Sequence, residues 1–262
     1  MISPLESKLR EDLCEAARRL YAAGFMSGSD GNLSAILTEG EILITPSRLS
    51  KGYLEPGQIV KVDPRGNKLA GEYSPTSEMA VHLACYQERP DICAVAHCHP
   101  PIITAFTVAG RGLPENILPE IELLFGGRIP LAPYASPGGS ALADTLRAPI
   151  RNRATSVVLM DHHGLVAVGN DIFQAAIRAE HAEAAARVIY YAEQLGGAKP
   201  LSPENVSALH QSHQALAEKE SGIFTGYCHV CAAKNGQEAP LTSSTIEGVV
   251  RRVMQEMVKE LG

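Results

Sequence analysis

The sequence predicts an α/β fold in which a largely antiparallel β-sheet is packed between helices. Two observations support this prediction. Segments with apolar residues at helical spacing alternate with short β-rich runs, and no internal repeat is present. The chain has 262 residues, of which 45% are hydrophobic. A chain of this length buries about 70% of its unfolded surface, so it can form a core without metal or disulfide support.

The first half of the chain is expected to contain two helices and several short strands. Helical spacing of apolar residues predicts a helix over residues 5–22, and Thr76 or Ser77 can cap a second helix over residues 78–89. β-rich runs predict strands over residues 33–37, 41–45, 59–63 and 92–97. The first two strands are joined by Glu39-Gly40, which is a hairpin signal. Pro90 closes the second helix.

The second half continues the same mixture and then changes in composition. Strands are predicted over residues 129–133, 156–160 and 165–168. Helices are predicted over residues 140–151, 172–194 and 203–220, the second of them rich in alanine. After residue 222 the chain becomes polar and contains Cys228 and Cys231. We therefore expect a folded domain over residues 1–222 and a linker over residues 223–243.

The last segment, residues 244–262, is expected to form a short amphipathic helix. Ser244-Thr245-Ile246-Glu247 is a capping-box sequence, and apolar residues follow it at helical spacing. A short helix after a linker is not stable alone, so its apolar face must pack against something. Its own subunit, a sister subunit and another protein are all candidates.

Charge and hydropathy exclude several functional classes. The net charge is −6, with 23 basic and 29 acidic residues scattered along the chain, and no basic stripe indicates nucleic-acid binding. No run approaches the ~18 apolar residues of a membrane span. The N-terminal segment carries acidic residues where a secretory signal needs an apolar core. We expect a cytoplasmic globular protein.

Histidines follow two of the predicted strands. In His97-Cys98-His99, strand geometry places both imidazoles on one face and the thiol on the other. Asp161-His162-His163-Gly164 follows a later strand, where a turn can bring a third imidazole to the same point. Three imidazoles with an open fourth position are typical of catalytic zinc. Each motif alone is also typical of ordinary residues at strand ends.

Three loops add polar groups to this pattern. In Pro75-Thr76-Ser77-Glu78 a carboxylate lies at the first turn of a predicted helix, where it can serve chemistry or simply interact with the helix dipole. The segments GNLS, residues 31–34, and TPSR, residues 45–48, carry small hydroxyl and amide side chains beside bends. Such loops can cradle a phosphate, although ordinary turns contain the same residues.

The order of these motifs is more specific than any one of them. From about residue 5 to 217 the chain resembles the class II aldolase/adducin-head family, because GNLS, TPS, PTSE, HCH and DHHG occur in that order. The resemblance implies a sheet between helices and a fourfold tetramer with active sites at subunit interfaces. It also implies a zinc-dependent lyase that cleaves a ketose 1-phosphate, such as L-fuculose 1-phosphate, to dihydroxyacetone phosphate and an aldehyde through a metal-stabilised enediolate.

The resemblance assigns roles to individual residues. One zinc ion per subunit is implied to bind His97, His99 and His163, with Glu78 as the acid/base carboxylate. The positions implied to hold the substrate phosphate are Asn32, Ser47, Thr76 and Ser77.

Two positions depart from the family pattern. Arg48 stands where family aldolases often have glycine. An arginine there can bind a phosphate or carboxylate, or it can point to solvent or pair with a neighbouring subunit. The fuculose enzymes use a tyrosine near the segment LPEI, residues 118–121, which contains none. Glu120 can occupy that space, so the proton donor to the aldehyde product is open.

Other members of the family supply alternatives. A zinc-dependent decarboxylase of an aromatic or hydroxy acid would use the same histidines, and Arg48 suits a carboxylate substrate. The pentulose-phosphate 4-epimerases carry aspartate at position 78, so Glu78 favours cleavage. Adducin-like interaction modules lack the metal histidines. The segment 244–262 also resembles the encapsulation peptides of bacterial microcompartments, which makes a shell protein a candidate partner.

Overall fold

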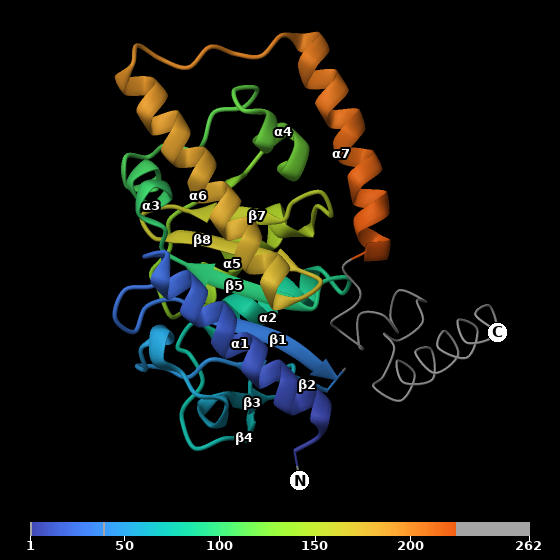
Figure 1. Ribbon diagram of the computed structural model, residues 1–262. Coiled ribbons are helices and arrows are strands. Elements are labelled where there is room, and N and C mark those ends of the chain that lie inside the picture. Colours follow the sequence, from blue (N-terminus) through green and yellow to red (C-terminus); the bar gives the residue numbers. More distant parts are fainter. Residues whose placement is uncertain (1, 39, 224–262) are drawn as a thin grey trace, which may run out of the picture.

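A computed structural model describes residues 2–38 and 40–223 (Figure 1). Its centre is an eight-stranded sheet with the order β4-β3-β2-β1-β5-β8-β7-β6. The strands are β1 Asn32–Thr38, β2 Glu41–Ile44, β3 Val60–Val62, β4 Lys68–Ala70, β5 Ala94–Cys98, β6 Leu131–Ala132, β7 Val157–Met160 and β8 Gly164–Gly169. Neighbouring strands are antiparallel, except for the parallel pair of β6 and β7.

Helices cover both faces of this sheet (Figure 1). One face is covered by α1 Pro4–Ala22, α3 Pro101–Val108 and α6 Ile172–Gln194. The other is covered by α2 Met79–Glu88 and α5 Ser140–Arg151. The predicted fold, a largely antiparallel sheet between helices, is confirmed.

The central strands are buried on both faces, and their alternation decides which side chains reach the site. In β5, Ala94, Ala96 and Cys98 belong to the core under α1, α3 and α6, whereas Val95 belongs to the core under α2 and α5. Successive strand residues point to opposite faces. His97 is therefore on the α2 side, where it is fully buried without being part of the apolar core.

One short helix, α4, and one long helix, α7, complete the described chain. Helix α4 Pro119–Phe125 packs against α7 Pro203–Ile223 beyond the β6 end of the sheet. The Nε2 atom of His210 lies 2.7 Å from Oε2 of the fully buried Glu122, and Nδ1 of His213 lies 2.7 Å from the carbonyl oxygen of Leu123. The 3-10 turns Lys51–Tyr53 and Pro56–Gln58 lie between β2 and β3.

The predicted elements all occur, with ends that shift by a few residues, and three further elements were missed. β4 is an exposed edge strand, so burial leaves no apolar pattern in it. α3 and α4 both have proline at the first helical position, where its missing N–H is not needed. The predicted linker and terminal helix, residues 223–243 and 244–262, lie outside the described residues, apart from residue 223 at the end of α7.

Among the helices of residues 2–38 and 40–223, none is long and apolar enough to cross a bilayer.

Candidate metal centre and active site

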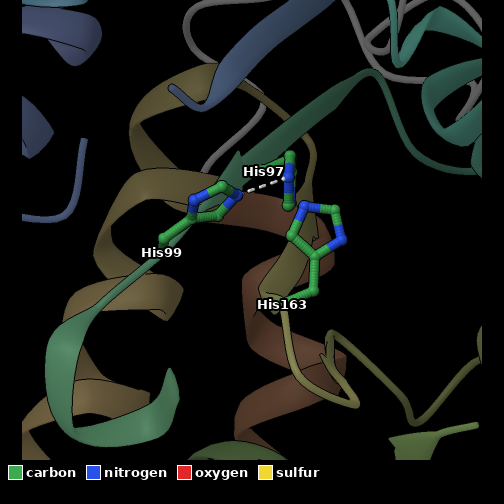
Figure 2. Close-up of side chains that lie close together, drawn as sticks. All are labelled: His97, His99 and His163. Atoms are coloured by element: carbon green, nitrogen blue, oxygen red, sulfur yellow. Dashed lines mark hydrogen bonds between the residues drawn. The ribbon is translucent and has the colours of Figure 1, made fainter. Parts of the chain in front are cut away.

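Three imidazoles from two neighbouring strand ends converge on one point. His97 lies in β5, His99 follows its last residue, and His163 lies in the hairpin between β7 and β8. The ring centroids are 4.8 Å apart in all three pairs. Nε2 of His97 and Nε2 of His99 are 3.0 Å apart. The dashed line in Figure 2 joins these two rings. The three histidines therefore lie together in one cluster, as the sequence analysis predicted.

A tight turn delivers His163 to the cluster. His162 adopts a left-handed backbone, with φ of 56°, and the His163 amide donates to the carbonyl of Met160 at 3.0 Å. Gly164 follows, and a Cβ there would clash with the carbonyl oxygen of Cys98 and with the ring of His99. The glycine after the two histidines thus allows the hairpin to lie directly against the end of β5.

The cluster has the chemistry of a divalent-metal site. Nδ1 of His97 lies 2.8 Å from the carbonyl oxygen of Leu165, which can only accept. The Nδ1 atom therefore carries the proton, and the Nε2 lone pair faces the other two rings. Two nitrogen ligands of a tetrahedral zinc ion stand about 3.3 Å apart for Zn–N bonds of about 2.05 Å, close to the spacing of the His97 and His99 Nε2 atoms.

Glu78 closes the cluster from the α2 side. It is the residue before the first turn of α2, but its side chain does not cap the helix. Oε2 lies 3.2 Å from Nε2 of His97, Oε1 lies 3.2 Å from Nε2 of His163, and Oε2 accepts a hydrogen bond of 2.8 Å from the Asn32 amide. Burial raises the pKa of Glu78, but its bonds with His163, His97 and Asn32 outweigh this and hold the pKa well below its usual range.

A cavity of about 700 Å³ opens beside this cluster. Its wall contains eight of the nine residues that the sequence singled out, namely Asn32, Ser47, Arg48, Thr76, Ser77, Glu78, His99 and His163. The ninth, His97, lies buried behind them. The three loops over residues 31–34, 45–48 and 75–78 are thus brought together around one opening.

Arg48 has an unusual backbone in this wall. Its φ is 62°, in the left-handed region that glycine adopts freely and other residues avoid. A glycine, which the family resemblance implies at this position, would adopt this φ without strain. A residue whose backbone is held in a strained conformation beside a cavity is a candidate for a role in binding.

Lys51 is a cavity residue that sequence reasoning missed. The side chain is 1% exposed, and Nζ donates to the carbonyl oxygens of Ser29 at 2.8 Å and Leu49 at 2.7 Å. Burial lowers its pKa to about 8, against the opposing attraction of Asp30 and Glu78. Nothing in the sequence near Lys51 distinguishes it from a surface lysine. Only the fold buries it.

His82 is a second residue that was missed, although the sequence carried a signal. It lies four residues after Glu78 and so on the same face of α2. It is fully buried and contacts Asn32. Glu120, in contrast, is exposed in the first turn of α4 and is not among the residues that line this cavity.

Comparisons with known proteins agree with this arrangement. Residues 11–190 match the family model described as class II aldolase and adducin N-terminal domain. A 3-oxo-tetronate 4-phosphate decarboxylase of Cupriavidus necator is 35% identical, over 70% of this chain and 84% of that protein. A 5-methylthioribulose-1-phosphate/5-deoxyribulose-1-phosphate aldolase of Escherichia coli is 37% identical, over 62% of this chain and 73% of that protein.

A solved structure described as L-fuculose 1-phosphate aldolase superposes with a TM-score of 0.72 at 26% sequence identity. The match covers 79% of this chain and 96% of that one. Residues 11–190, which the family model matches, contain the whole sheet, the three histidines and the cavity loops. The chain therefore belongs to the class II aldolase and adducin N-terminal domain family.

Proposed function

We propose that this protein is a metal-dependent lyase that produces the enediolate of a phosphorylated three-carbon ketone. The observation that carries the proposal is the meeting of His97, His99, His163 and Glu78 at the wall of a cavity rich in hydroxyl, amide and cationic groups. A divalent ion such as zinc, one per chain, would bind the three histidines and supply Lewis-acid stabilisation of negative charge on the substrate.

The chain's own residues would orient the substrate and move its proton. Asn32, Ser47, Thr76 and Ser77 are proposed to bind the phosphate through side-chain and backbone donors, and Lys51 adds positive charge beneath the same loops. Glu78 is proposed to exchange the proton at the carbon where the bond is cut, because its carboxylate faces the histidine cluster and the cavity.

The main candidate reaction is aldol cleavage of a ketose 1-phosphate. For a substrate such as L-fuculose 1-phosphate, breaking the bond between the third and fourth carbons leaves its electron pair on the third carbon. The fourth-carbon hydroxyl gives its proton to the ionised Glu78 and becomes an aldehyde. Glu78 then passes that proton to the third carbon, which yields dihydroxyacetone phosphate. The relative from Escherichia coli named above is an aldolase of this type of substrate.

Decarboxylation is the second candidate, and Arg48 is the observation that favours it. A 3-oxo acid with a terminal phosphate loses CO₂ to leave the same enediolate and hence the same ketone. Arg48 lies in the cavity wall, where its guanidinium can bind a carboxylate. Loss of CO₂ does not require a residue that exchanges a proton with the oxygen of a departing aldehyde. This fits the absence of tyrosine from residues 118–121.

One assay separates these candidates. The zinc-loaded chain is supplied with L-fuculose 1-phosphate, 5-deoxyribulose 1-phosphate or 3-oxo-tetronate 4-phosphate, and dihydroxyacetone phosphate is detected by coupled reduction. Aldehyde and CO₂ are measured in parallel. We expect a ketose phosphate to release ketone and aldehyde in equal amounts. Release of CO₂ and ketone without aldehyde would select the decarboxylase, and no product from any of the three would overturn the proposal.

Assembly is part of the same proposal. We propose a fourfold tetramer built from domains 1–222, with residues 244–262 as a docking segment for a sister subunit or a microcompartment shell protein. A chain truncated after residue 222 should remain tetrameric in analytical ultracentrifugation. If the truncated chain still co-sediments with shell proteins as the full chain does, the docking role is wrong.

A further inference from the structure

A row of buried polar side chains leads from Glu78 away from the cavity into the space between β1 and α2. Asn32 Oδ1 lies 2.5 Å from Nε2 of His82. Nδ1 of His82 lies 2.7 Å from Oγ of Ser34, which lies 2.7 Å from the hydroxyl of Tyr86. His82 and Ser34 are fully buried, and Asn32 is 3% exposed. The row joins the acid/base carboxylate to groups that cannot touch substrate.

The hydrogens in this row have only one consistent direction. Nδ2 of Asn32 donates to Oε2 of Glu78, and Oδ1 of Asn32, which can only accept, faces His82. Nε2 of His82 must then donate. Burial lowers the pKa of His82 to about 3, so the ring is neutral and Nδ1 accepts from Ser34. Ser34 in turn accepts from Tyr86.

We infer that His82 is a positioning residue that locks the Asn32 amide with its NH₂ group toward Glu78 and the cavity. Asn32 also lines the cavity, so one side chain serves both the carboxylate and the proposed phosphate. If the amide turned over, its carbonyl oxygen would face two negative groups at once. The role of His82 rests on the proposed function, since it supports both substrate binding and the position of Glu78.

The fold explains why the donor is a buried histidine. His82 lies one turn after Glu78 on α2, and Ser34 lies two residues after Asn32 on β1, so each pair shares a face. The ring of His82 spans the gap between β1 and α2, and each of its nitrogens forms one hydrogen bond, Nε2 with Asn32 and Nδ1 with Ser34. A hydroxyl or a short amide in its place would satisfy one partner only.

Two substitutions that differ by one methylene test this inference. In His82→Gln the amide NH₂ can take the place of Nε2 and still donate to Asn32. In His82→Asn the shorter side chain reaches only the place of Nδ1, which leaves Asn32 free to turn over. With the zinc-loaded full chain we expect His82→Asn to weaken inorganic phosphate binding and to lower kcat by about 10- to 100-fold. His82→Gln should recover most of both, and bound zinc should be unchanged in each.

A spectroscopic measurement tests the same point without activity. Nitrogen-15 NMR of the histidine rings should show His82 as the neutral Nε2–H tautomer from pH 6 to pH 8. Observation of the Nδ1–H tautomer, or equal phosphate affinity in His82→Asn and wild type, would overturn the inference. If His82→Asn does not fold, Ser34→Ala replaces it and should weaken phosphate binding in the same direction.

The outcomes also separate this inference from the proposed reaction. A chain with no lyase activity, but with the Nε2–H tautomer and a phosphate affinity that falls in His82→Asn and recovers in His82→Gln, would retain the inference and lose the reaction. Lyase activity that is identical in wild type and His82→Asn would do the reverse.

Discussion

The carboxylate Oε2 of Glu78 lies 3.2 Å from Nε2 of His97, although the two residues belong to different layers of the fold. The contact forms because His97 is the strand residue on the α2 side of β5 and Glu78 immediately precedes α2. The proposed acid/base group is thereby held against the proposed metal ligands without being one of the three histidines. This contact underlies the first prediction.

Glu78→Gln should remove proton transfer and leave the site otherwise assembled. The amide has the same shape, but it cannot take up or release a proton at the pH of the assay. We expect kcat to fall by about 10²- to 10⁴-fold, the usual contribution of a general acid or base. Bound zinc measured by atomic emission should stay near one ion per chain. A variant with wild-type kcat would show that Glu78 is not the acid/base group.

Removal of the metal should affect stability as well as activity. An ion that binds only the folded state raises the free energy of unfolding by about 2.7 kcal/mol when its free concentration is 100 times Kd. We expect a chelator to lower the thermal midpoint of the wild type and added zinc to restore it. His163→Ala should show neither response. If zinc raises the midpoint of this variant as it does that of the wild type, His163 is not a ligand.

Lys51→Met tests the buried cation under the cavity. The pKa of Lys51 is lowered to about 8, so its charge is present below that pH and is lost as the pH rises through it. We expect wild-type affinity for phosphate to fall by about tenfold from pH 7 to pH 9, because a charge-assisted bond contributes about 1.5–3 kcal/mol. The variant should bind weakly at both values.

The lowered pKa of Lys51 also predicts the direction in which the free energy of unfolding changes with pH. Between pH 8 and the ordinary value of 10.5 for lysine, the unfolded chain keeps the proton that the folded chain has released. The contribution of Lys51 to the free energy of unfolding should therefore increase as the pH rises through this window, and it should be constant below it. Denaturant titrations at pH 7, 8.5 and 9.5 check this. The difference in the free energy of unfolding between wild type and Lys51→Met should change as the pH rises above about 8. A difference that does not depend on pH would contradict the lowered pKa.

Arg48→Gly and Arg48→Ala separate the side chain from the backbone strain. Both remove the guanidinium, so both should lower kcat/KM for a carboxylate substrate by about tenfold or more and affect a ketose phosphate less. Only glycine relieves the left-handed φ of 62°. The left-handed backbone costs alanine about 1–2 kcal/mol, and the greater unfolded-chain entropy of glycine offsets about 0.4–1 kcal/mol of this, so we expect the glycine variant to be the more stable in urea titrations, by about 1 kcal/mol. Equal stabilities would mean that the backbone moves when the side chain is removed.

Gly164→Ala tests the close approach of the hairpin to β5. The added methyl group would meet the carbonyl oxygen of Cys98, which is backbone and cannot turn away. We expect a loss of about 1–3 kcal/mol in the free energy of unfolding, together with weaker zinc binding. Gly57→Ala is the matched control, because nothing lies within 4 Å of a Cβ placed there. It should stay within about 0.5 kcal/mol of the wild type.

Local sequence patterns determined most of the elements and the set of chemical groups. Periodicity located the long helices α1, α5, α6 and α7 and the central strands, because burial of one face selects apolar residues at a fixed spacing. It could not locate α3, α4 or β4, whose prolines or exposed positions give no such spacing. The three histidines, Glu78 and the residues proposed to bind phosphate were predicted from short motifs in a fixed order.

The tertiary structure alone decided which of these groups act on one another. The spacing of His97 and His99 predicts a shared face, but only the left-handed turn at His162 and the close packing of Gly164 bring His163 to them. The burial of Lys51 and the row from Glu78 to Tyr86 depend on contacts between segments far apart in the chain. Motifs report the residue types that a reaction needs, whereas burial, pKa and hydrogen-bond direction are properties of the packed environment.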